Sequence, residues 1–299
     1  MLNDNLIVGV IQTSLDADVA WDKNESWKNA VKISKNEEAR AKKEIRHYFS
    51  ALRGLDKKPD VVLLPELAVP AGYESKLEKI AEDLQCIVIA GLDYNITTTT
   101  PPTVSNEAIV IVPRILRGTK IAAQTAKRRV GKTYAAPGER SKLNKIAQPV
   151  EFQPLPTVWL FESATLGNFG VAVCYDFLDL DRTVLYRKKI QTLFILAYNQ
   201  DINTFDHVAE SIARTVFCNV VVCNCGHFGG SMAVAPFREP FRRTVYRHSG
   251  NKLANVQVVE LPLKDLADHH NNQGPDGLFK SLPPGFDALE HLNERTQAI

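Results

Sequence analysis

Short apolar runs alternate with charged segments along the chain, and this pattern predicts alternating strands and helices. Residues 5–12 (NLIVGVIQ) and 60–67 (DVVLLPEL) are apolar runs of strand length, whereas the segment 25–53 between them is charged and helical in character. Further along we expect a helix over 74–84, strands over 86–94 and 106–116, and a loop over 97–103 (TTTTPPT). The first part of the chain is therefore built from strand, helix, strand units.

The alternation resumes beyond a basic segment at 127–140. Strands are expected over 157–161, within FGVAVCYDF, and over 191–198, 219–225, 231–236, 241–247 and 256–263, with helices over 179–189 and 206–217. Because no internal repeat or compositional linker interrupts this series, the prediction is one domain over 1–264 and an irregular polar tail over 265–299. So many strand runs favour an α/β fold in which two sheets pack face to face with helices outside.

Size and charge narrow the class of protein. The 299 residues are 44% hydrophobic, as in ordinary soluble globular proteins. The 36 lysines and arginines nearly balance the 34 acidic residues, so no overall charge attracts nucleic acid. One basic run, Lys127, Arg128 and Arg129, lacks interleaved aromatic residues and is interpreted as solvated surface. We expect no nucleic-acid partner.

The N-terminus and the cysteines indicate the compartment. The sequence MLNDNLIVGVIQTSL lacks the basic region and the small-residue cleavage site of a signal peptide, and no apolar stretch has transmembrane length. Five cysteines are an odd number in a chain of this size, which favours reduced thiols. The expectation is a cytoplasmic protein without a membrane partner.

Cys174 is the first candidate for chemistry. It follows the apolar run VAV and precedes the acidic stretch YDFLDLD, so it lies where a strand passes into a turn. Catalytic groups favour such strand ends, because a rigid element fixes one side of the residue while a loop admits substrate. An ordinary buried core cysteine is the alternative interpretation.

Glu66 is the second candidate. It ends the apolar strand run VVLLPEL, between Pro65 and Leu67, where few neighbours solvate its carboxylate. Such desolvation favours the protonated acid, which suits a general base that takes a proton from a thiol. A surface glutamate at the end of a strand is the alternative.

Lys132 is the third candidate. It lies in GKT, but a phosphate-binding loop needs a glycine at the position of Ala126, so that interpretation fails. Because the turn-forming sequence APGE follows, Lys132 is expected to be held at the base of a loop. Lys127 is within reach as a rival for the same role.

A zinc site is the other chemistry considered. The run CNVVVCNCGH contains Cys218, Cys223, Cys225 and His227, but its spacing differs from the paired C-x-x-C pattern. The cysteines are therefore interpreted as core thiols. His227 and Phe228 are candidates for lining a pocket.

The order and spacing of the three candidates resemble the nitrilase superfamily of carbon–nitrogen hydrolases. Glu66 in LLPEL, Lys132 seven residues ahead of Glu139, and Cys174 in VAVCYD match the family's Glu, Lys, Cys constellation. The later segments LFILAYN, AESIARTVFCNVVVCN and GGSMAVAP also look like the family's second half. The chain departs from the pattern where the family commonly has a glutamate after proline, seven residues beyond the cysteine: here stands Asp181.

The resemblance implies a fold, an activity and roles for residues. The fold is a four-layer αββα sandwich of two mixed sheets that forms homodimers or larger homo-oligomers, with the tail after 265 as a candidate dimer arm. The activity is hydrolysis of an amide or carbamoyl group of a small molecule through a thioester on Cys174. Glu66 would act as general base and acid, and Lys132 would stabilise the tetrahedral intermediate. No metal or organic cofactor is implied.

The resemblance also leaves positioning residues and alternatives. Glu139 would orient substrate or Lys132, and Tyr175 and Asn199 are further candidates for positioning substrate. The same triad would serve a nitrilase or an amide-forming acyltransferase, and the fold alone would suit a catalytically silent binding or regulatory module.

Overall fold

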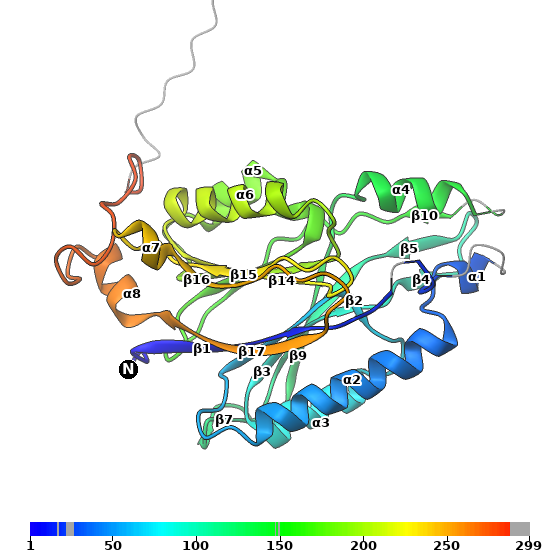
Figure 1. The fold of residues 1–299 in the computed structure, drawn as a ribbon, viewed down its shortest axis with the longest axis horizontal. Coiled ribbons are helices and arrows are strands. Elements are labelled where there is room, and N and C mark those ends of the chain that lie inside the picture. Colours follow the sequence, from blue (N-terminus) through cyan, green and yellow to red (C-terminus); the bar gives the residue numbers. More distant parts are fainter. Residues whose placement is uncertain (17, 22–26, 147, 149, 288–299) are drawn as a thin grey trace, which may run out of the picture.

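A computed structural model describes residues 1–16, 18–21, 27–146, 148 and 150–287. Four layers stack in the order helices, sheet, sheet, helices (Figure 1). The prediction of two packed sheets with helices outside is confirmed. Among the described residues, no helix has both the length and the apolar composition that crossing a membrane requires.

The first sheet has parallel strands at its centre and antiparallel strands at both edges. Its strands are β1 (Asn5–Gln12), β2 (Val61–Val69), β3 (Ile87–Leu92), β6 (Glu107–Val112), β9 (Ala126–Gly131) and β17 (Asn255–Pro262), in the order β17-β1-β2-β3-β6-β9. β2 pairs in parallel with both β1 and β3. Every residue of β2 is buried, because layers cover both of its faces, and this explains its continuously apolar sequence.

The second sheet repeats this plan. Its strands are β11 (Leu160–Phe161), β12 (Phe169–Val173), β13 (Thr192–Ala197), β14 (Asn219–Asn224), β15 (Ser231–Val234) and β16 (Thr244–His248), in sequence order. β13 pairs in parallel with β12 and β14. The main core lies between the two sheets and includes Leu63, Phe194 and Val221.

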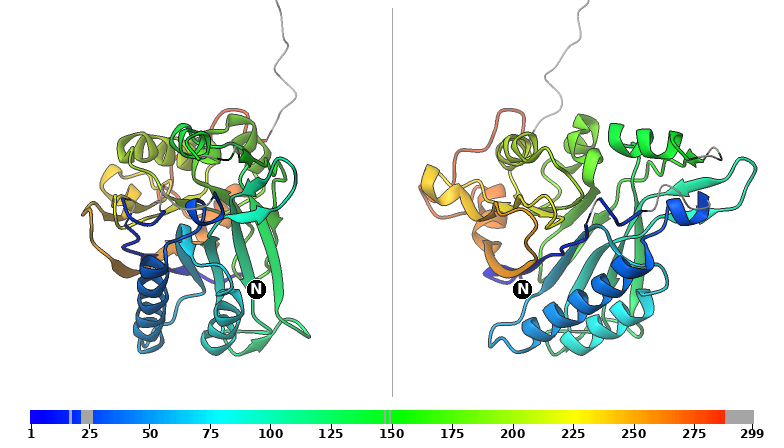
Figure 2. Two further views of the ribbon diagram at one scale, coloured as in Figure 1. Left: turned by 90° about the vertical axis from the view of Figure 1, so that its right-hand side faces the viewer. Right: turned by 45° about the vertical axis from the view of Figure 1, so that its right-hand side comes forward.

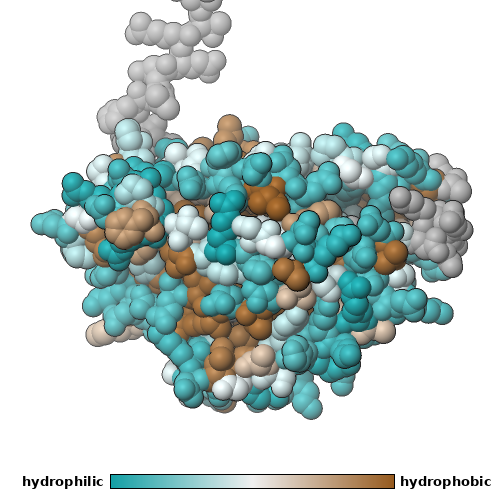
Figure 3. All heavy atoms as spheres, in the orientation of Figure 1, coloured by the Kyte–Doolittle hydropathy of each residue, from teal (hydrophilic) through white to brown (hydrophobic). Residues whose placement is uncertain are grey.

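Helices cover the outer faces of both sheets. α2 (Lys35–Arg53) and α3 (Glu74–Leu84) lie on the first sheet, and α5 (Leu180–Tyr186) and α6 (Ile202–Thr215) lie on the second (Figures 1 and 2). The remaining helices are α1 (Trp27–Ala30), α4 (Pro137–Asn144), α7 (Pro240–Arg243) and α8 (Lys264–His270). A second core under α2 and α3 extends to partly buried residues of the edge strand β17, and apolar atoms gather beneath that strand at the surface (Figure 3).

Several elements differ from the sequence-based expectations. The basic segment contains an edge strand, β9, and the helix α4, neither of which was expected. The short strands β4 (Asn95–Thr97), β5 (Thr103–Ser105) and β10 (Glu151–Phe152) form a small third sheet, and β7 (Ile115–Leu116) pairs with β8 (Thr119–Lys120). Positions 25 and 26 of the first predicted helix lie outside the described residues.

The tail after residue 265 begins with regular structure rather than irregular chain. α8 leads into a segment whose Phe279 and Phe286 pack with Phe217 and Phe237 in a separate aromatic cluster. The tail therefore contacts its own domain as far as residue 287, where Asp287 pairs with Lys188 at 2.6 Å, and residues 288–299 lie outside the described part of the chain.

Candidate active site

Glu66 lies in an irregular part of β2. The pairing of β2 with β3 shifts between Leu64 and Val69, and Leu67 has a left-handed backbone, with φ of 57°. Gly91 of β3 faces this bulge: a Cβ there would lie 2.3 Å from the Pro65 carbonyl oxygen and 2.4 Å from the Glu66 Cα. Only glycine leaves room for the bulged backbone, which turns the Glu66 side chain into the site.

Lys132 follows directly after the edge strand β9. Its backbone N–H donates to the Asn106 carbonyl oxygen at 2.8 Å, and the residue is 1% exposed. Lys127, its rival, is exposed on β9, where its ammonium pairs with Glu78 at 2.8 Å. The two lysines therefore have different surroundings, and only Lys132 lies in the buried site.

Cys174 begins a short 3₁₀ helix, η1 (Cys174–Leu178), directly after β12. Its φ of 47° is left-handed, a conformation that costs a non-glycine residue roughly 1–3 kcal/mol and clusters at functional sites. The residue is 5% exposed. The expected junction of strand and turn is present, and the strained turn directs the thiol away from the strand ladder.

One ammonium and two carboxylates form the centre of the site. Lys132 Nζ donates to Glu66 Oε1 at 2.8 Å and to Glu139 Oε2 at 2.7 Å. The Asn106 amide bridges the two carboxylates, because its Nδ2 donates to Glu66 Oε1 at 2.7 Å and to Glu139 Oε1 at 2.9 Å. The Tyr94 hydroxyl also donates to Glu139 Oε1, at 2.8 Å. Every carboxylate of this centre is thus held by at least two donors.

The opposite charges of this centre stabilise one another. Burial lowers the pKa of Lys132, but the negative charge of Glu66 and the charge and hydrogen bond of Glu139 raise it to well above the usual value, so the lysine stays protonated. Burial raises the pKa of Glu139, but the Lys132 ammonium and the hydrogen bonds from Lys132, Asn106 and Tyr94 leave it below the usual value.

The Cys174 thiol is neutral at rest. Burial raises its pKa well above the usual value, the Glu66 charge raises it further, and the Lys132 charge and a hydrogen bond from the Tyr198 backbone lower it only in part. A hydrogen bond joins the thiol to Glu66. The arrangement suits a thiol that loses its proton to a neighbouring carboxylate at the moment of attack, rather than a preformed thiolate.

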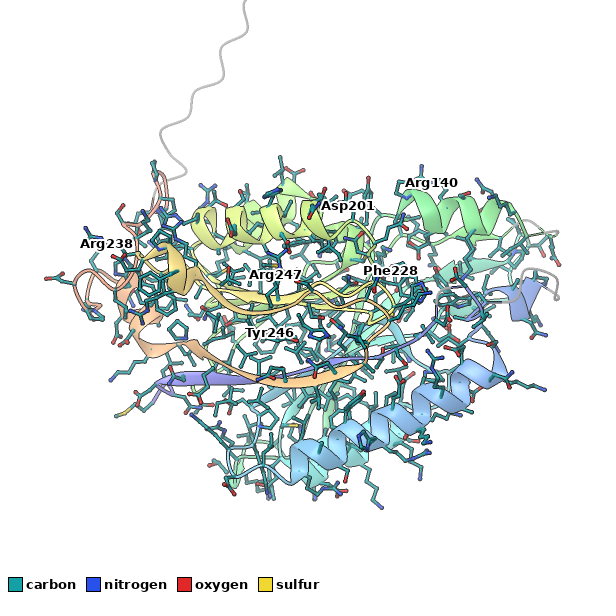
Figure 4. The ribbon with its side chains drawn as sticks, viewed as in Figure 1. Arg140, Asp201, Phe228, Arg238, Tyr246 and Arg247 are labelled. Carbon is teal, nitrogen blue, oxygen red and sulfur yellow. The ribbon has the colours of Figure 1, made fainter. Side chains whose placement is uncertain are left out.

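These groups open into a cavity of about 480 Å³. The aromatic side chains in its lining come from Trp21, Tyr94, Tyr175, Tyr198, Phe205 and Phe228. Asn199 and Asp201 also line it, and Figure 4 labels Asp201, at the start of α6, and Phe228, in the loop after β14. The structure therefore brings Glu66, Lys132, Glu139 and Cys174 together in one cavity, with Tyr175 and Asn199 in its lining.

The other candidates lie elsewhere. Cys223 and Cys225 are buried, and their thiols donate to backbone carbonyl oxygens. His227 contacts Asp16 at 3.3 Å. Within the described residues, the one group with metal-ligand spacing is Asp16, Asp18 and His227, and no cysteine belongs to it.

Sequence reasoning missed Asn106 and Tyr94. Both reach the site from outside the three motifs, and neither stands in a pattern that marks it as functional. Asp176 was visible in VAVCYD but received no role. Its side chain is fully buried and accepts hydrogen bonds from the residues that follow Lys132.

No protein-family model matches the sequence, and no curated protein sequence does. Solved structures do match. One is Nit3 of Saccharomyces cerevisiae, a member of branch 10 of the nitrilase superfamily, with 15% identity over 92% of this chain and 96% of that chain and a TM-score of 0.57. Another is XC1258 of Xanthomonas campestris, a CN-hydrolase superfamily protein, with 13% identity over 90% of this chain and 94% of that chain and a TM-score of 0.60. An amidase from Nesterenkonia sp. matches with 14% identity over 91% of this chain and 97% of that chain, with a TM-score of 0.57. At these identities the likeness concerns the fold, and it shows that this chain has the αββα fold of the nitrilase, or carbon–nitrogen hydrolase, superfamily.

Proposed function

We propose that this protein hydrolyses a carbon–nitrogen bond in the amide or carbamoyl group of a small molecule. The observation that carries the proposal is the buried contact of Lys132 with Glu66, 2.8 Å long, in the cavity that also holds the Cys174 thiol. A thiol, a carboxylate that accepts its proton and a fixed ammonium are the groups that acyl transfer through a thioester needs.

In the first half of the reaction, the Cys174 sulfur attacks the carbonyl carbon as its proton passes to Glu66. Negative charge then develops on the carbonyl oxygen, where the Lys132 ammonium stabilises it; removal of one such donor typically costs about 2.7–4 kcal/mol of barrier. The carbon–nitrogen bond breaks as Glu66 returns the proton to the leaving nitrogen. Ammonia or an amine departs, and a thioester on Cys174 remains.

In the second half, water hydrolyses the thioester. Glu66 accepts a proton from the water as its oxygen attacks the thioester carbon, and Lys132 again stabilises the negative charge. The carbon–sulfur bond breaks, Glu66 returns the proton to the sulfur, and the carboxylic acid leaves. Glu139 keeps Lys132 in place, and Tyr175 and Asn199 are assigned to positioning the substrate from the cavity lining.

The amidase from Nesterenkonia sp. supports this assignment by analogy. One structure of a mutant of that protein shows covalent addition of the acetamide moiety of fluoroacetamide at its active-site cysteine (14% identity, TM-score 0.58). We assign the corresponding role of nucleophile to Cys174 in this chain.

A panel of small amides, ureas and nitriles, assayed for ammonia release, tests the proposal. We expect turnover of at least one amide or urea, its loss in Cys174→Ala, and a thioester on Cys174 detected by mass spectrometry after an acid quench. Turnover of nitriles alone identifies a nitrilase, and a thioester that forms but is released only by an added amine identifies an acyltransferase. Absence of any adduct across the panel supports a silent binding module.

We also propose that the protein is a cytoplasmic homo-oligomer, most simply a dimer, assembled through α5. Apolar side chains of this short helix face solvent: Leu180 is 78% exposed, Leu185 50% and Val184 42%. Burial of such neighbouring side chains favours association. Light scattering is expected to give at least twice the mass of 33.3 kDa, and Leu180→Glu is expected to lower it.

A further inference from the structure

The two reactive turns belong to different sheets. Lys132 follows β9 of the first sheet, and Cys174 follows β12 of the second. Side-chain packing, rather than a hydrogen-bonded ladder, joins these two sheets. The distance between the ammonium and the sulfur therefore depends on whatever joins the two turns directly.

The Asp176 carboxylate joins them. It stands two residues after Cys174 and is fully buried. Its Oδ2 accepts the backbone N–H of Thr133 at 2.8 Å, and its Oδ1 accepts that of Tyr134 at 2.9 Å. Thr133 and Tyr134 are the two residues that follow Lys132, so one carboxylate spans the turn of the nucleophile and the turn of the lysine.

Arg182 of α5 completes the connection. Its Nη2 donates to Asp176 Oδ2 at 2.9 Å and to the Thr133 hydroxyl at 2.9 Å, and the residue is 4% exposed. The guanidinium neutralises the buried carboxylate and contacts the lysine's turn itself. Hydrogen bonds to buried charged groups are stronger than neutral ones, which makes this link stiff.

We infer that Asp176, supported by Arg182, is a positioning residue that sets the location of the Lys132 ammonium relative to the Cys174 sulfur. Asp176 contacts neither the thiol nor the cavity and acts through the backbone of residues 133 and 134. The inference rests on the proposed function for its effect on turnover, but its effect on the thiol is independent of any substrate.

Asp176→Asn tests the inference. Asparagine has one acceptor oxygen, so its amide nitrogen would face either the Tyr134 N–H, or both the Thr133 N–H and the Arg182 guanidinium, and at least one donor loses its partner. We expect kcat to fall by about 100-fold, the effect of a displacement of about 1 Å in a catalytic group, with little change in KM. We expect alkylation of Cys174 by iodoacetamide at a fixed, mildly alkaline pH to slow, because the displaced ammonium stabilises the thiolate less.

The alkylation rates of the other four cysteines distinguish a local displacement in the site from a general loosening of the fold. All four are buried, so unfolding or loosening would expose them to the reagent, whereas a local displacement would slow Cys174 alone. Asp60→Asn is the matched control: Asp60 is also fully buried, accepts the Ile7 backbone N–H at 2.8 Å and pairs with Arg117, but lies outside the cavity. This control is expected to leave both kcat and the Cys174 rate unchanged.

The possible results are distinct. A folded Asp176→Asn with the wild-type Cys174 alkylation rate overturns the inference, and so does faster alkylation of all five thiols. If the wild type releases no ammonia from any substrate but Asp176→Asn still slows alkylation of Cys174 alone, the proposed function fails and the positioning role stands. If Asp176→Asn does not fold, Arg182→Gln replaces it, and an unchanged Cys174 rate in that variant overturns the inference.

Discussion

Replacement of Glu66 by glutamine isolates the proton transfer. The Lys132 ammonium and the Asn106 amide both donate to the same oxygen of this carboxylate, Oε1. The glutamine oxygen therefore occupies that position and keeps both hydrogen bonds, and its NH₂ group takes the place of Oε2. An amide nitrogen accepts no proton from a thiol, so Glu66→Gln changes the chemistry while leaving the local geometry nearly as it is.

The expected loss is large in rate and small in stability. General base catalysis contributes about 100- to 10,000-fold, which corresponds to about 2.7–5.4 kcal/mol of barrier. The substitution removes the charge of one of the two carboxylates that contact Lys132, while Glu139 still pairs with the lysine at 2.7 Å. The unfolding free energy therefore loses only part of the stabilisation of the ammonium. A hydrogen bond to a charged group is worth about 1.5–3 kcal/mol, so the change in stability should stay below about 3 kcal/mol.

Steady-state ammonia release and denaturant unfolding measure the two quantities on the same preparation. Glu37→Gln is the control, because Glu37 is 5% exposed, accepts the Asp16 backbone N–H at 2.9 Å and pairs with Arg40 away from the cavity. This control should lose stability without losing kcat. The reasoning is refuted if Glu66→Gln keeps the wild-type kcat, or if its rate loss equals the loss expected from its unfolded fraction.

Two further predictions concern the backbone and pH. Gly91→Ala should displace the β2 bulge that carries Glu66, because the new Cβ would lie 2.4 Å from the Glu66 Cα. We expect a loss of about 1–3 kcal/mol in unfolding free energy and a fall in kcat. Burial raises the pKa of Asp93 from 3.8 to about 6, against hydrogen bonds from the Ile33 and Tyr94 backbones. Its contribution to stability is therefore complete below 3.8 and is lost as the pH rises through about 6, so the stability of wild type relative to Asp93→Asn should fall across that range.

Each of these has a result that would contradict it. Gly54→Ala is the control for Gly91→Ala, because the atom nearest to the Cβ added at Gly54 is 3.5 Å away. Equal effects of the two substitutions on stability and kcat would show that the close contact at Gly91 is irrelevant. For Asp93, urea unfolding at several pH values gives the difference between the proteins. A difference that is constant or rises with pH would disprove the stated direction.

The sequence predicts the central strands and the position of the reactive cysteine well. The strands β2, β12, β13 and β14 are buried at every position, so their apolar runs are continuous and unambiguous. The same continuity makes the polar residues that end these runs conspicuous, which is why Glu66 and Cys174 stand out. Their proximity in space follows from two parallel-centred sheets that pack face to face.

The edge of the first sheet was not predictable in this way. β9 has the sequence AKRRVG, and its first four residues are exposed, because an edge strand contacts the sheet on one side only. The charged sequence of β9 therefore resembles that of a solvated loop. Three ion pairs, from Lys127 and Arg129 to α3 and β6, hold the strand in place, and they join residues that are 22–55 positions apart in the sequence. Asn106 escaped notice for a related reason: its side chain contacts the site through residues 33 and 40 positions away.

The pair of carboxylates around a single ammonium has a consequence for what leaves the cavity. Two carboxylates and one ammonium give this centre a formal charge of one net negative unit, and moving the thiol proton to Glu66 leaves that sum unchanged. In the proposed reaction, an uncharged amide enters this environment without electrostatic penalty. The acid formed from it ionises and then meets a like-signed centre, so the product is repelled outward and inhibition by accumulated product should be weak.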